Sequence, residues 1–200
     1  EAATLPCAAL TAWHALISEG KITADQTVLL LGTGGVSIFA LQFAKLQGAR
    51  VIITSSSDEK LSRAKSLGAD ETINYRSHPD WEQEVQRLTQ TRGADHVVEV
   101  GGKDTLPRSL RAVALGGTIS VIGGVSGFTS EIALGDILSK CALIRGIFVG
   151  NRDMFESMNR AISHHKLKPV IDRVFPFSEA QAAYRYLQGA KHFGKVVVSI

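Results

Sequence analysis

The sequence predicts an α/β fold: a doubly wound parallel sheet with helices on both of its faces. Apolar runs of strand length alternate along the chain with segments of helical periodicity, which is the pattern of βαβ units. Two of these runs, Leu29–Leu31 and Val51–Ile53, are apolar at every position, as expected for strands that are buried on both faces. With 44% hydrophobic residues in a chain of 200, the sequence also supplies enough apolar surface for the core of such a sheet.

Each expected strand is an apolar run, and each expected helix carries apolar residues on one side. In the segment Gly35–Gln47, for example, apolar residues separated by three or four positions form a single stripe. The expected strands are Thr27–Leu31, Arg50–Thr54, Glu71–Asn74, His96–Val100, Thr118–Ile122 and Ala142–Phe148. The expected helices before residue 115 are Ala2–Gly20, Gly35–Gln47, Asp58–Leu67, Trp81–Leu88 and Thr105–Ala114.

The regular alternation ends at Gly150. A helix over Asp153–His164 is followed by an extended stretch, Lys168–Phe177, which is interrupted by prolines, and then by a helix over Ser178–Gln188 and a terminal apolar run, Lys195–Ile200. We therefore expect residues 1–150 to form one domain with a leading helix, and residues 151–200 to be an extension that packs on it.

Charge and cysteine content exclude several classes of protein. The net charge is only +3, and the longest basic cluster, His164–Lys168, resembles a solvated helix end more than a nucleic-acid footprint. No apolar stretch approaches the length of a membrane span. Cys7 and Cys141 do not form a disulfide framework, so a reducing, cytoplasmic location is expected. The chain begins at Glu1, which we interpret as a processed or excised piece of a longer protein.

A glycine-rich turn between the first expected strand and the next helix is the strongest local signal. The turn reads Gly32-Thr33-Gly34-Gly35-Val36. In dinucleotide-binding turns the first glycine allows a sharp bend and the second lets a pyrophosphate approach the backbone, roles that fit Gly32 and Gly34. The third position holds Ser37 instead of glycine. Because the following helix offers free N–H groups to phosphate, we expect a bound dinucleotide, with a merely tight turn as the alternative.

The end of the second strand indicates which dinucleotide is preferred. NAD-binding folds place a carboxylate there for the ribose 2′-hydroxyl, whereas this chain has Ser55 and Ser56. Small hydroxyls leave room for a 2′-phosphate, and Lys60 can supply positive charge. NADP(H) is therefore favoured over NAD(H), although Asp58 is a carboxylate that would restore NAD binding. Ser57 is also expected to cap the helix that begins at Asp58.

Short motifs occur in a fixed order along the whole chain: Leu5–Trp13, Gly32–Ser37, Leu67–Asp70, Ile73–Arg76, Val98–Gly102, Gly116–Gly117, Ile122–Gly123 and Phe193–Val197. In this order they resemble the medium-chain dehydrogenase/reductase superfamily, and most closely its zinc-type alcohol dehydrogenase-like and NADPH:quinone oxidoreductase-like members. The resemblance covers essentially the whole chain, so it is more specific than the glycine turn. It implies a Rossmann fold of six parallel strands, followed by a carboxy-terminal extension that belongs to a catalytic domain absent from this chain.

The resemblance also implies roles for individual residues. Thr11 would approach the nicotinamide end of the cofactor, and Gly34, Gly35 and Val36 would hold the pyrophosphate. Lys60 and Tyr75 would bind the adenosine 2′-phosphate, with an ordinary strand-end aromatic as the alternative for Tyr75. Lys195 would lie near the phosphates. The loops Val100–Gly102, Gly123–Val125 and Phe148–Gly150 would surround the nicotinamide, with Gly101, Gly123, Gly124 and Val149 as the contacting residues.

Zinc is not expected within this chain. Catalytic zinc takes three protein ligands, and Cys7 stands where zinc-dependent members of the superfamily carry one of them. The other ligands would lie in an amino-terminal region that this chain does not contain. Cys7 is therefore expected to be a small buried thiol, with a ligand as the alternative. His164 and His165 are adjacent on a helix and do not face a common point.

We expect an NADP(H)-dependent oxidoreductase that transfers hydride to or from a carbonyl, a quinone or an activated double bond, and that is incomplete and inactive as this piece alone. No nucleophile, base or carboxylate pair is visible in the sequence, so the cofactor would supply the chemistry. The alternatives are a non-catalytic NADP(H)-binding module and an enoyl-thioester reductase domain of a larger synthase. The expected partners are a small-molecule substrate and, through an edge strand at Ala142–Phe148, a second copy of the chain; nucleic acid and membrane are not expected.

Overall fold

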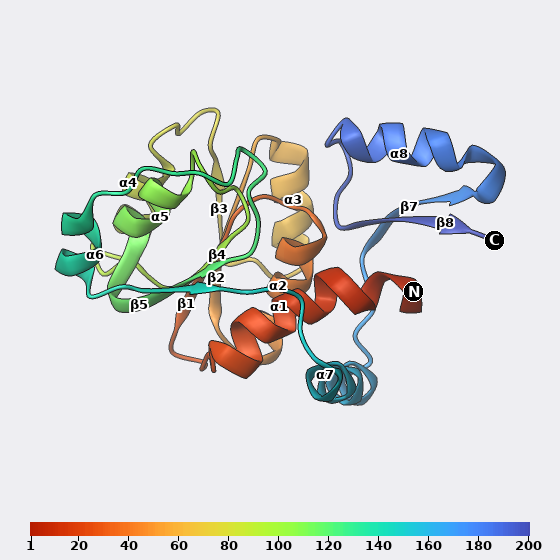
Figure 1. Cartoon of the computed structure of the whole chain (residues 1–200), viewed down its shortest axis with the longest axis horizontal. Helices are drawn as coiled ribbons and strands as arrows, with labels where there is room; N and C mark the ends of the chain where they lie inside the picture. Colours follow the sequence, from red (N-terminus) through yellow and green to blue (C-terminus); the bar gives the residue numbers. More distant parts are fainter.

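The computed structural model describes residues 1–200 and is built around a six-stranded parallel sheet (Figure 1). The strand order is β3-β2-β1-β4-β5-β6, which is the order of a doubly wound sheet, so the predicted fold is confirmed. Strands β2 and β3 are added on one side of β1 and strands β4 to β6 on the other, so the strand order reverses between β1 and β4. The carboxyl ends of β1 and β4 lie side by side at this point. The strands are β1 (Thr27–Leu30), β2 (Arg50–Ser55), β3 (Glu71–Asn74), β4 (Ala94–Glu99), β5 (Val113–Val121) and β6 (Leu143–Gly146).

Helices cover both faces of this sheet. The first face is covered by a leading helical segment and by α2 (Gly35–Leu46), α3 (Asp58–Ser66) and α7 (Arg152–His165). The second face is covered by α4 (Trp81–Leu88), α5 (Leu106–Ala112) and α6 (Leu134–Lys140). The leading segment is continuous but changes its hydrogen-bond pattern along its length, through η1 (Ala2–Thr4), η2 (Leu5–Ala9), α1 (Leu10–Trp13) and η3 (His14–Glu19).

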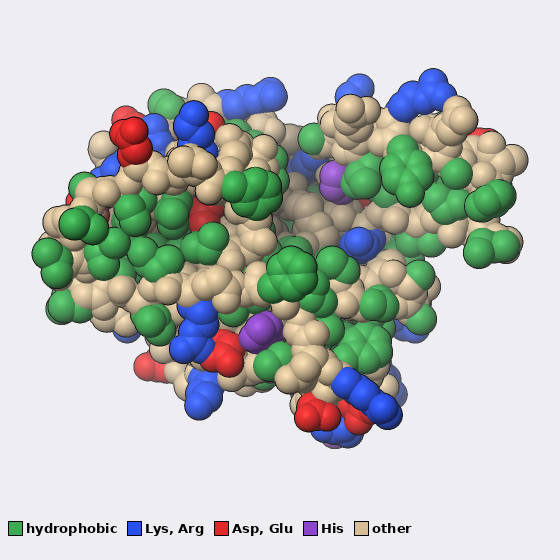
Figure 2. All heavy atoms as spheres, viewed as in Figure 1, with side chains coloured by type: hydrophobic (Ala, Val, Ile, Leu, Met, Phe, Trp, Pro, Cys, Tyr) green, Lys and Arg blue, Asp and Glu red, His purple; other side chains and the backbone are tan.

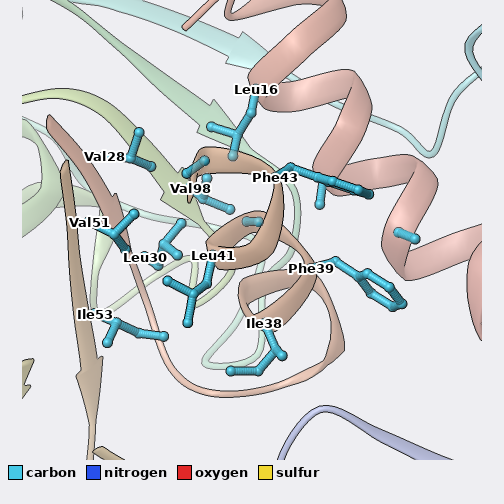
Figure 3. Close-up of a cluster of buried hydrophobic side chains, with 14 of the residues drawn as sticks. Leu16, Val28, Leu30, Ile38, Phe39, Leu41, Phe43, Val51, Ile53 and Val98 are labelled. Atoms are coloured by element: carbon cyan, nitrogen blue, oxygen red, sulfur yellow. The ribbon is translucent and has the colours of Figure 1, made fainter. Parts of the chain in front are cut away.

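Alternate residues of each central strand enter opposite cores. Val28 and Leu30 of β1 face α2, while Leu29 packs with α4 and α5 on the other side. Figure 3 shows the first core, where Leu41 of α2 lies over these strands and Phe43 points towards the leading helical segment, against Trp13. The side chains named from β1 and α2 are at most 1% exposed. Burial on both faces explains why the strands read as unbroken apolar runs in the sequence.

The carboxy-terminal residues form a smaller unit beside the main sheet (Figure 1). It contains β7 (Ile171–Pro176), η4 (Phe177–Glu179), α8 (Ala180–Gln188) and β8 (Lys195–Ser199), and β7 and β8 pair in parallel. This unit joins the main sheet through an isolated bridge between Gly34 and Gly194. The glycine turn and the end of the chain are therefore held together.

Several predicted elements differ from the structure. The helix expected over Thr105–Ala114 ends at Ala112 and β5 starts at Val113, but the regular ladder to β4 begins only at Thr118, because the pairing shifts there. The strand expected over Ala142–Phe148 is shorter and spans Leu143–Gly146. Helix α6 has no counterpart among the predicted helices, although its apolar residues Leu134, Ile137 and Leu138 are spaced as on one helix face; the helix is only seven residues long and none of its residues is fully buried.

No helix in the structure combines the length and the apolar character needed to cross a membrane.

Candidate functional site

The glycine turn bends the chain from β1 into α2. Gly32 has φ +72°, a conformation that side chains other than glycine rarely adopt. Gly34 caps α2 with an extended backbone, and no side chain occupies the cap. The Ser37 hydroxyl donates to the carbonyl of Leu31 at 2.7 Å, so the serine at the third motif position fastens the helix to the strand end. The first turn of α2 is thus open at its amino end, where an anion is favoured.

The space above Gly34 is free, and Lys195 lies beside it. A Cβ placed on Gly34 would meet no atom within 4 Å, whereas one on Gly35 would lie 2.8 Å from Cδ of Lys195. The amide of Gly194 donates to the carbonyl of Thr33 at 3.0 Å, which holds β8 against the turn. The structure therefore brings together an uncapped helix, an unobstructed glycine and a lysine. These features fit a bound pyrophosphate.

The residues expected to read the 2′-phosphate meet at the end of β2. Ser55 is buried, its hydroxyl accepts from the amide of Ser57 at 3.4 Å, and its carbonyl accepts from the amide of Tyr75 at 3.0 Å. Ser56 is half-buried and Tyr75 is exposed. The Ser57 side chain accepts from the amide of Lys60, which confirms the predicted helix cap.

Lys60 also reaches the carboxy-terminal unit. Its Nζ donates to the carbonyl of Ala190 at 2.7 Å, and partial burial lowers its pKa despite the opposing charge of Asp172. His192 lies in the same region, and burial together with the charges of Lys60 and Lys195 lowers its pKa. Figure 2 shows the surface hollowed between the main sheet and this unit, with basic and histidine side chains near the hollow. The basic side chains along this hollow are suited to a ligand that carries several phosphate groups.

A hydrogen-bonded ion pair fixes the position of the carboxy-terminal unit. Asp172 of β7 accepts from Arg63 of α3 at 2.9 Å and from the hydroxyl of Tyr186 at 2.6 Å. Burial alone would raise the pKa of Asp172, but these two hydrogen bonds and the positive charge of Arg63 hold it below its ordinary value. The guanidinium of Arg63 also lies 4.3 Å from the ring centroid of Phe193, next to the bridge at Gly194.

A buried carboxylate, Glu99, organises the loop that follows β4. Glu99 is 0% exposed, and its Oε1 accepts from the amides of Gly101 and Gly102 at 2.8 and 3.0 Å and from the hydroxyl of Thr105 at 2.6 Å. Its other oxygen accepts from the hydroxyl of Ser109. A buried charge with this many donors is well satisfied, so the loop is held in one conformation.

The loops after β4 and β5 pack tightly against each other. A Cβ on Gly102 would lie 2.4 Å from the carbonyl oxygen of Gly127 and 2.6 Å from Cα of Gly124, and one on Gly123 would lie 3.0 Å from the carbonyl oxygen of Val100. The structure thus places Gly101, Gly123 and Gly124 together at the carboxyl edge of the sheet. Their contact with a nicotinamide stays a prediction.

Val149 lies in the third expected loop, after β6. It adopts φ +47°, and its carbonyl lies 3.0 Å from Nδ1 of His14. The leading helical segment therefore contacts the same edge of the sheet as the glycine turn. Thr11, one turn earlier on that segment, is buried, and its hydroxyl donates back to the carbonyl of Cys7 at 2.8 Å.

Cys7 itself is exposed, so the expectation of a buried thiol is wrong. The change of hydrogen-bond pattern along the leading segment places Cys7 in a π-helical turn whose buried members are Ala8 and Ala9. Within residues 1–200 no three histidine, cysteine, aspartate or glutamate side chains are grouped so that they could hold a metal ion.

His96 and Ser120 form a histidine–serine pair, but not one that a substrate can reach. The two side chains are 2.9 Å apart between β4 and β5, and they are 2% and 1% exposed. Burial lowers the pKa of His96 to about 4, so the ring is neutral near pH 7. Because the pair lies inside the sheet and away from its carboxyl edge, its role is structural.

Two contributors to this edge were missed by sequence reasoning. Glu99 follows a buried strand and precedes two glycines, a pattern that places a carboxylate at a tight loop. His14 is three positions after Thr11 on the same helical segment, so helical spacing was the available signal. The partner of His14, Val149, lies 135 residues away in sequence, which no local pattern specifies, whereas the donors to the Glu99 carboxylate all lie within ten residues of it.

Comparisons with known proteins agree with this geometry. A family model described as "Zinc-binding dehydrogenase" matches residues 35–164. The chain is 50% identical over 206 positions to a zinc-type alcohol dehydrogenase-like protein of Schizosaccharomyces pombe, an alignment that covers 100% of this chain and 60% of that protein. The chain therefore spans about 60% of the length of this relative.

Two solved structures resemble the whole chain. One is an NAD-dependent alcohol dehydrogenase, with 39% identity and a TM-score of 0.93, of which the alignment covers 58%, together with 100% of this chain. The other is a 2-octenoyl-CoA carboxylase reductase in complex with NADP and 2-octenoyl-CoA, with 28% identity and a TM-score of 0.88 over 98% of this chain and 49% of that one. Because the family model covers most of the chain and the fold agrees throughout, this chain belongs to the zinc-binding dehydrogenase family, within the medium-chain dehydrogenase/reductase superfamily.

Proposed function

We propose that this chain is the nucleotide-binding part of an NADP(H)-dependent oxidoreductase. When bound, the reduced nicotinamide cofactor would donate hydride to a carbonyl, a quinone or an activated double bond, and the oxidised cofactor would accept hydride in the reverse direction. The observation that carries the proposal is the free space above Gly34, next to the uncapped start of α2 and to Lys195. A pyrophosphate needs these three features: close approach to the backbone, free N–H donors and a positive charge.

The residues at the end of β2 favour NADP(H) over NAD(H). No carboxylate follows the strand directly, and the nearest, Asp58, accepts a hydrogen bond at 2.7 Å from Asn74. To bind the 2′-phosphate, the Lys60 ammonium group would have to exchange its hydrogen bond to the carbonyl of Ala190 for one to the phosphate. Ser56 lies close to Lys60 in sequence, and Tyr75 lies across the end of β2. Of the two solved relatives, one binds NADP and the other is NAD-dependent, so cofactor preference rests on these residues.

The chain's own residues would then bind and orient the cofactor. The loops after β4, β5 and β6 would surround the nicotinamide, and Glu99 would keep the first of them rigid. No proton donor for the reaction is assigned within this chain. We propose that residues 1–150 form the nucleotide-binding domain, and that residues 151–200 pack on it and lead towards a catalytic domain in the full-length protein, since the yeast relative is considerably longer than this chain.

A second candidate function is an enoyl-thioester reductase. The specific observation in its favour is that the solved relative complexed with NADP also holds 2-octenoyl-CoA, an enoyl thioester. Activity of the full-length protein with an enoyl-CoA, compared with a simple quinone and an aldehyde, separates the two candidates. A non-catalytic NADP(H)-binding module would turn over none of them.

A second copy of the chain is the proposed protein partner. β6 pairs only with β5 and leaves its other edge open, and the apolar side chains of Leu134, Leu138 and Leu143 are 72%, 75% and 48% exposed beside it. Figure 2 shows hydrophobic side chains gathered over this region at the α6 end of the molecule. Two such edges can pair about a two-fold axis and cover each other's apolar residues.

Fluorescence titration of the chain with NADPH and with NADH tests the proposed function. We expect saturable binding of both, with NADPH bound at least about tenfold more tightly, since a charge-assisted hydrogen bond contributes about 1.5–3 kcal/mol. Equal binding of the two cofactors removes the preference for NADP(H), and absence of binding removes the cofactor assignment altogether.

A further inference from the structure

The loop after β6 contains a residue in a strained conformation. Val149 has φ +47°, which a β-branched side chain rarely adopts because its Cβ then crowds the backbone. Other non-glycine residues with positive φ occur in the chain, but only Val149 lies in a loop that directly follows a strand of the six-stranded sheet. Strain of this kind persists only where the surroundings impose it, and it concentrates at ligand-binding sites.

Contacts on both sides of Val149 impose this conformation. Before it, the amide of Ile147 donates to the carbonyl of Val121 at 2.9 Å. After it, Gly150 packs directly on the leading helical segment, since a Cβ there would lie 2.9 Å from Cγ of Leu10. The Val149 side chain is half-buried against the first core, while Phe148 between these anchors is 92% exposed.

His14 makes the one side-chain hydrogen bond to the strained residue itself. Nδ1 of His14 and the carbonyl oxygen of Val149 are 3.0 Å apart, and a carbonyl only accepts, so the ring carries its hydrogen on Nδ1. This bond fixes the direction of the Val149 carbonyl, which is what a change of φ and ψ at Val149 would alter. The backbone of the loop is thereby tied to the leading helical segment.

We propose that His14 is a positioning residue that holds the Val149 loop in the conformation that receives the nicotinamide. The proposal rests on the proposed function, because it needs a nicotinamide cofactor at the carboxyl edge of the sheet. His14 does not touch the cofactor; it acts through the carbonyl and the strained backbone of Val149. The adenosine half of the cofactor, bound more than one loop away at the end of β2, is independent of it.

The test compares His14→Ala with His14→Asn, using NADPH and 2′,5′-ADP as probes. 2′,5′-ADP carries the adenosine 2′-phosphate but no nicotinamide. Loss of one hydrogen bond should weaken NADPH binding by about 5- to 10-fold in His14→Ala and leave 2′,5′-ADP binding within about twofold. His14→Asn places an amide N–H where Nδ1 stood and should restore most of the NADPH affinity.

Val149→Gly provides the control for the strained backbone. Glycine adopts φ near +47° without strain, so the loop should keep its conformation without help from His14. We therefore expect His14→Ala to have less than about a twofold effect on NADPH binding in the Val149→Gly background. An effect of His14→Ala as large there as in the wild-type protein would overturn the coupling between the two residues.

Hydrogen exchange of residues 147–150, measured by mass spectrometry without any ligand, separates failure of this proposal from failure of the proposed function. Exchange should accelerate in His14→Ala and not in His14→Asn. If exchange is unchanged, His14 does not hold the loop. If exchange accelerates while NADPH binding is unchanged, the loop does not receive the nicotinamide. If the wild-type protein binds 2′,5′-ADP and NADPH equally tightly, the nicotinamide makes no contact and the proposal fails; if it binds neither, the proposed function fails first.

Discussion

Replacement of Gly34 by alanine separates cofactor binding from folding. Gly34 has φ −78°, which alanine adopts freely, and the added methyl group would meet no protein atom within 4 Å. It would instead occupy the space proposed for the pyrophosphate. We therefore expect a variant that folds normally and binds NADPH poorly.

Two opposing terms set the stability of this variant. Alanine is a poorer helix cap than glycine by about 0.5–1 kcal/mol. It also restricts the unfolded chain, which stabilises the native state by about 0.4–1 kcal/mol. The two contributions nearly cancel, so the unfolding temperature should stay within about 3 °C of the wild-type value. A methyl group that displaces a phosphate from charge-assisted hydrogen bonds of about 1.5–3 kcal/mol should weaken NADPH binding by about 10- to 100-fold.

Gly32→Ala is the matched control, two residues away in the same turn. A Cβ on Gly32 also meets no atom within 4 Å, but φ there is +72°. The left-handed conformation should cost alanine about 1–2 kcal/mol of stability. Fluorescence titration with NADPH and thermal unfolding, applied to both variants, should give loss of binding without loss of stability for Gly34→Ala and loss of stability for Gly32→Ala. Wild-type NADPH affinity in a fully folded Gly34→Ala variant would refute the pyrophosphate site.

Four further predictions follow from other parts of the structure. Lys60→Met removes the ammonium group but keeps the apolar stem, and should weaken the affinity for NADPH about tenfold in a binding titration while changing the affinity for NADH less than about twofold. Equal losses of affinity for the two cofactors would contradict a role of Lys60 at the 2′-phosphate. Glu99→Ala leaves buried donors of the β4–α5 loop unpaired and should cost roughly 3–5 kcal/mol in urea unfolding, whereas Glu99→Gln keeps one oxygen for the three donors at Oε1 and its NH2 can donate to the Ser109 hydroxyl, so it should cost about 1 kcal/mol. Similar losses of stability in the two variants would argue against the loop contacts. Because the folded-state pKa of His96 is lowered to about 4, the unfolded chain binds more protons between pH 6.5 and 4, so the free energy of unfolding should decrease as the pH is lowered, by about 2 kcal/mol from pH 7 to pH 5. A His96→Gln variant should lack that part of the pH dependence, and an identical pH profile in the variant would show that His96 is not its source. Analytical ultracentrifugation should find a dimer that Leu143→Lys converts to monomer, and a wild-type monomer would exclude the β6 pairing.

The central part of the fold could be predicted from the sequence because its signals are local. The central residues of β1 and β2, Val28–Leu30 and Val51–Ile53, are all apolar and buried, and α2 has a clear apolar stripe, so both patterns report burial directly. Helix α6 was missed because it is short: its seven residues carry only three apolar positions on one face, Leu134, Ile137 and Leu138, which is too few to define a helical period. The exposure of Cys7 was also beyond local reasoning, since it depends on the changing helical pattern of residues 2–19.

The candidate site was only partly accessible to sequence reasoning. The turn from Gly32 to Gly35 is recognisable because glycine has few other reasons to recur at that spacing between a strand and a helix. The bridge between Gly34 and Gly194 and the bond between His14 and Val149 join residues far apart in the chain. Such contacts follow from tertiary packing, and no periodicity or spacing encodes them.

A crystal structure of the chain with NADP tests the central claim most directly. We expect electron density for the pyrophosphate above Gly34, at the start of α2 and beside Lys195, and for the 2′-phosphate within hydrogen-bonding distance of Lys60. Density for the cofactor elsewhere on the protein, or a glycine turn left empty at a cofactor concentration that saturates binding in solution, would contradict this claim.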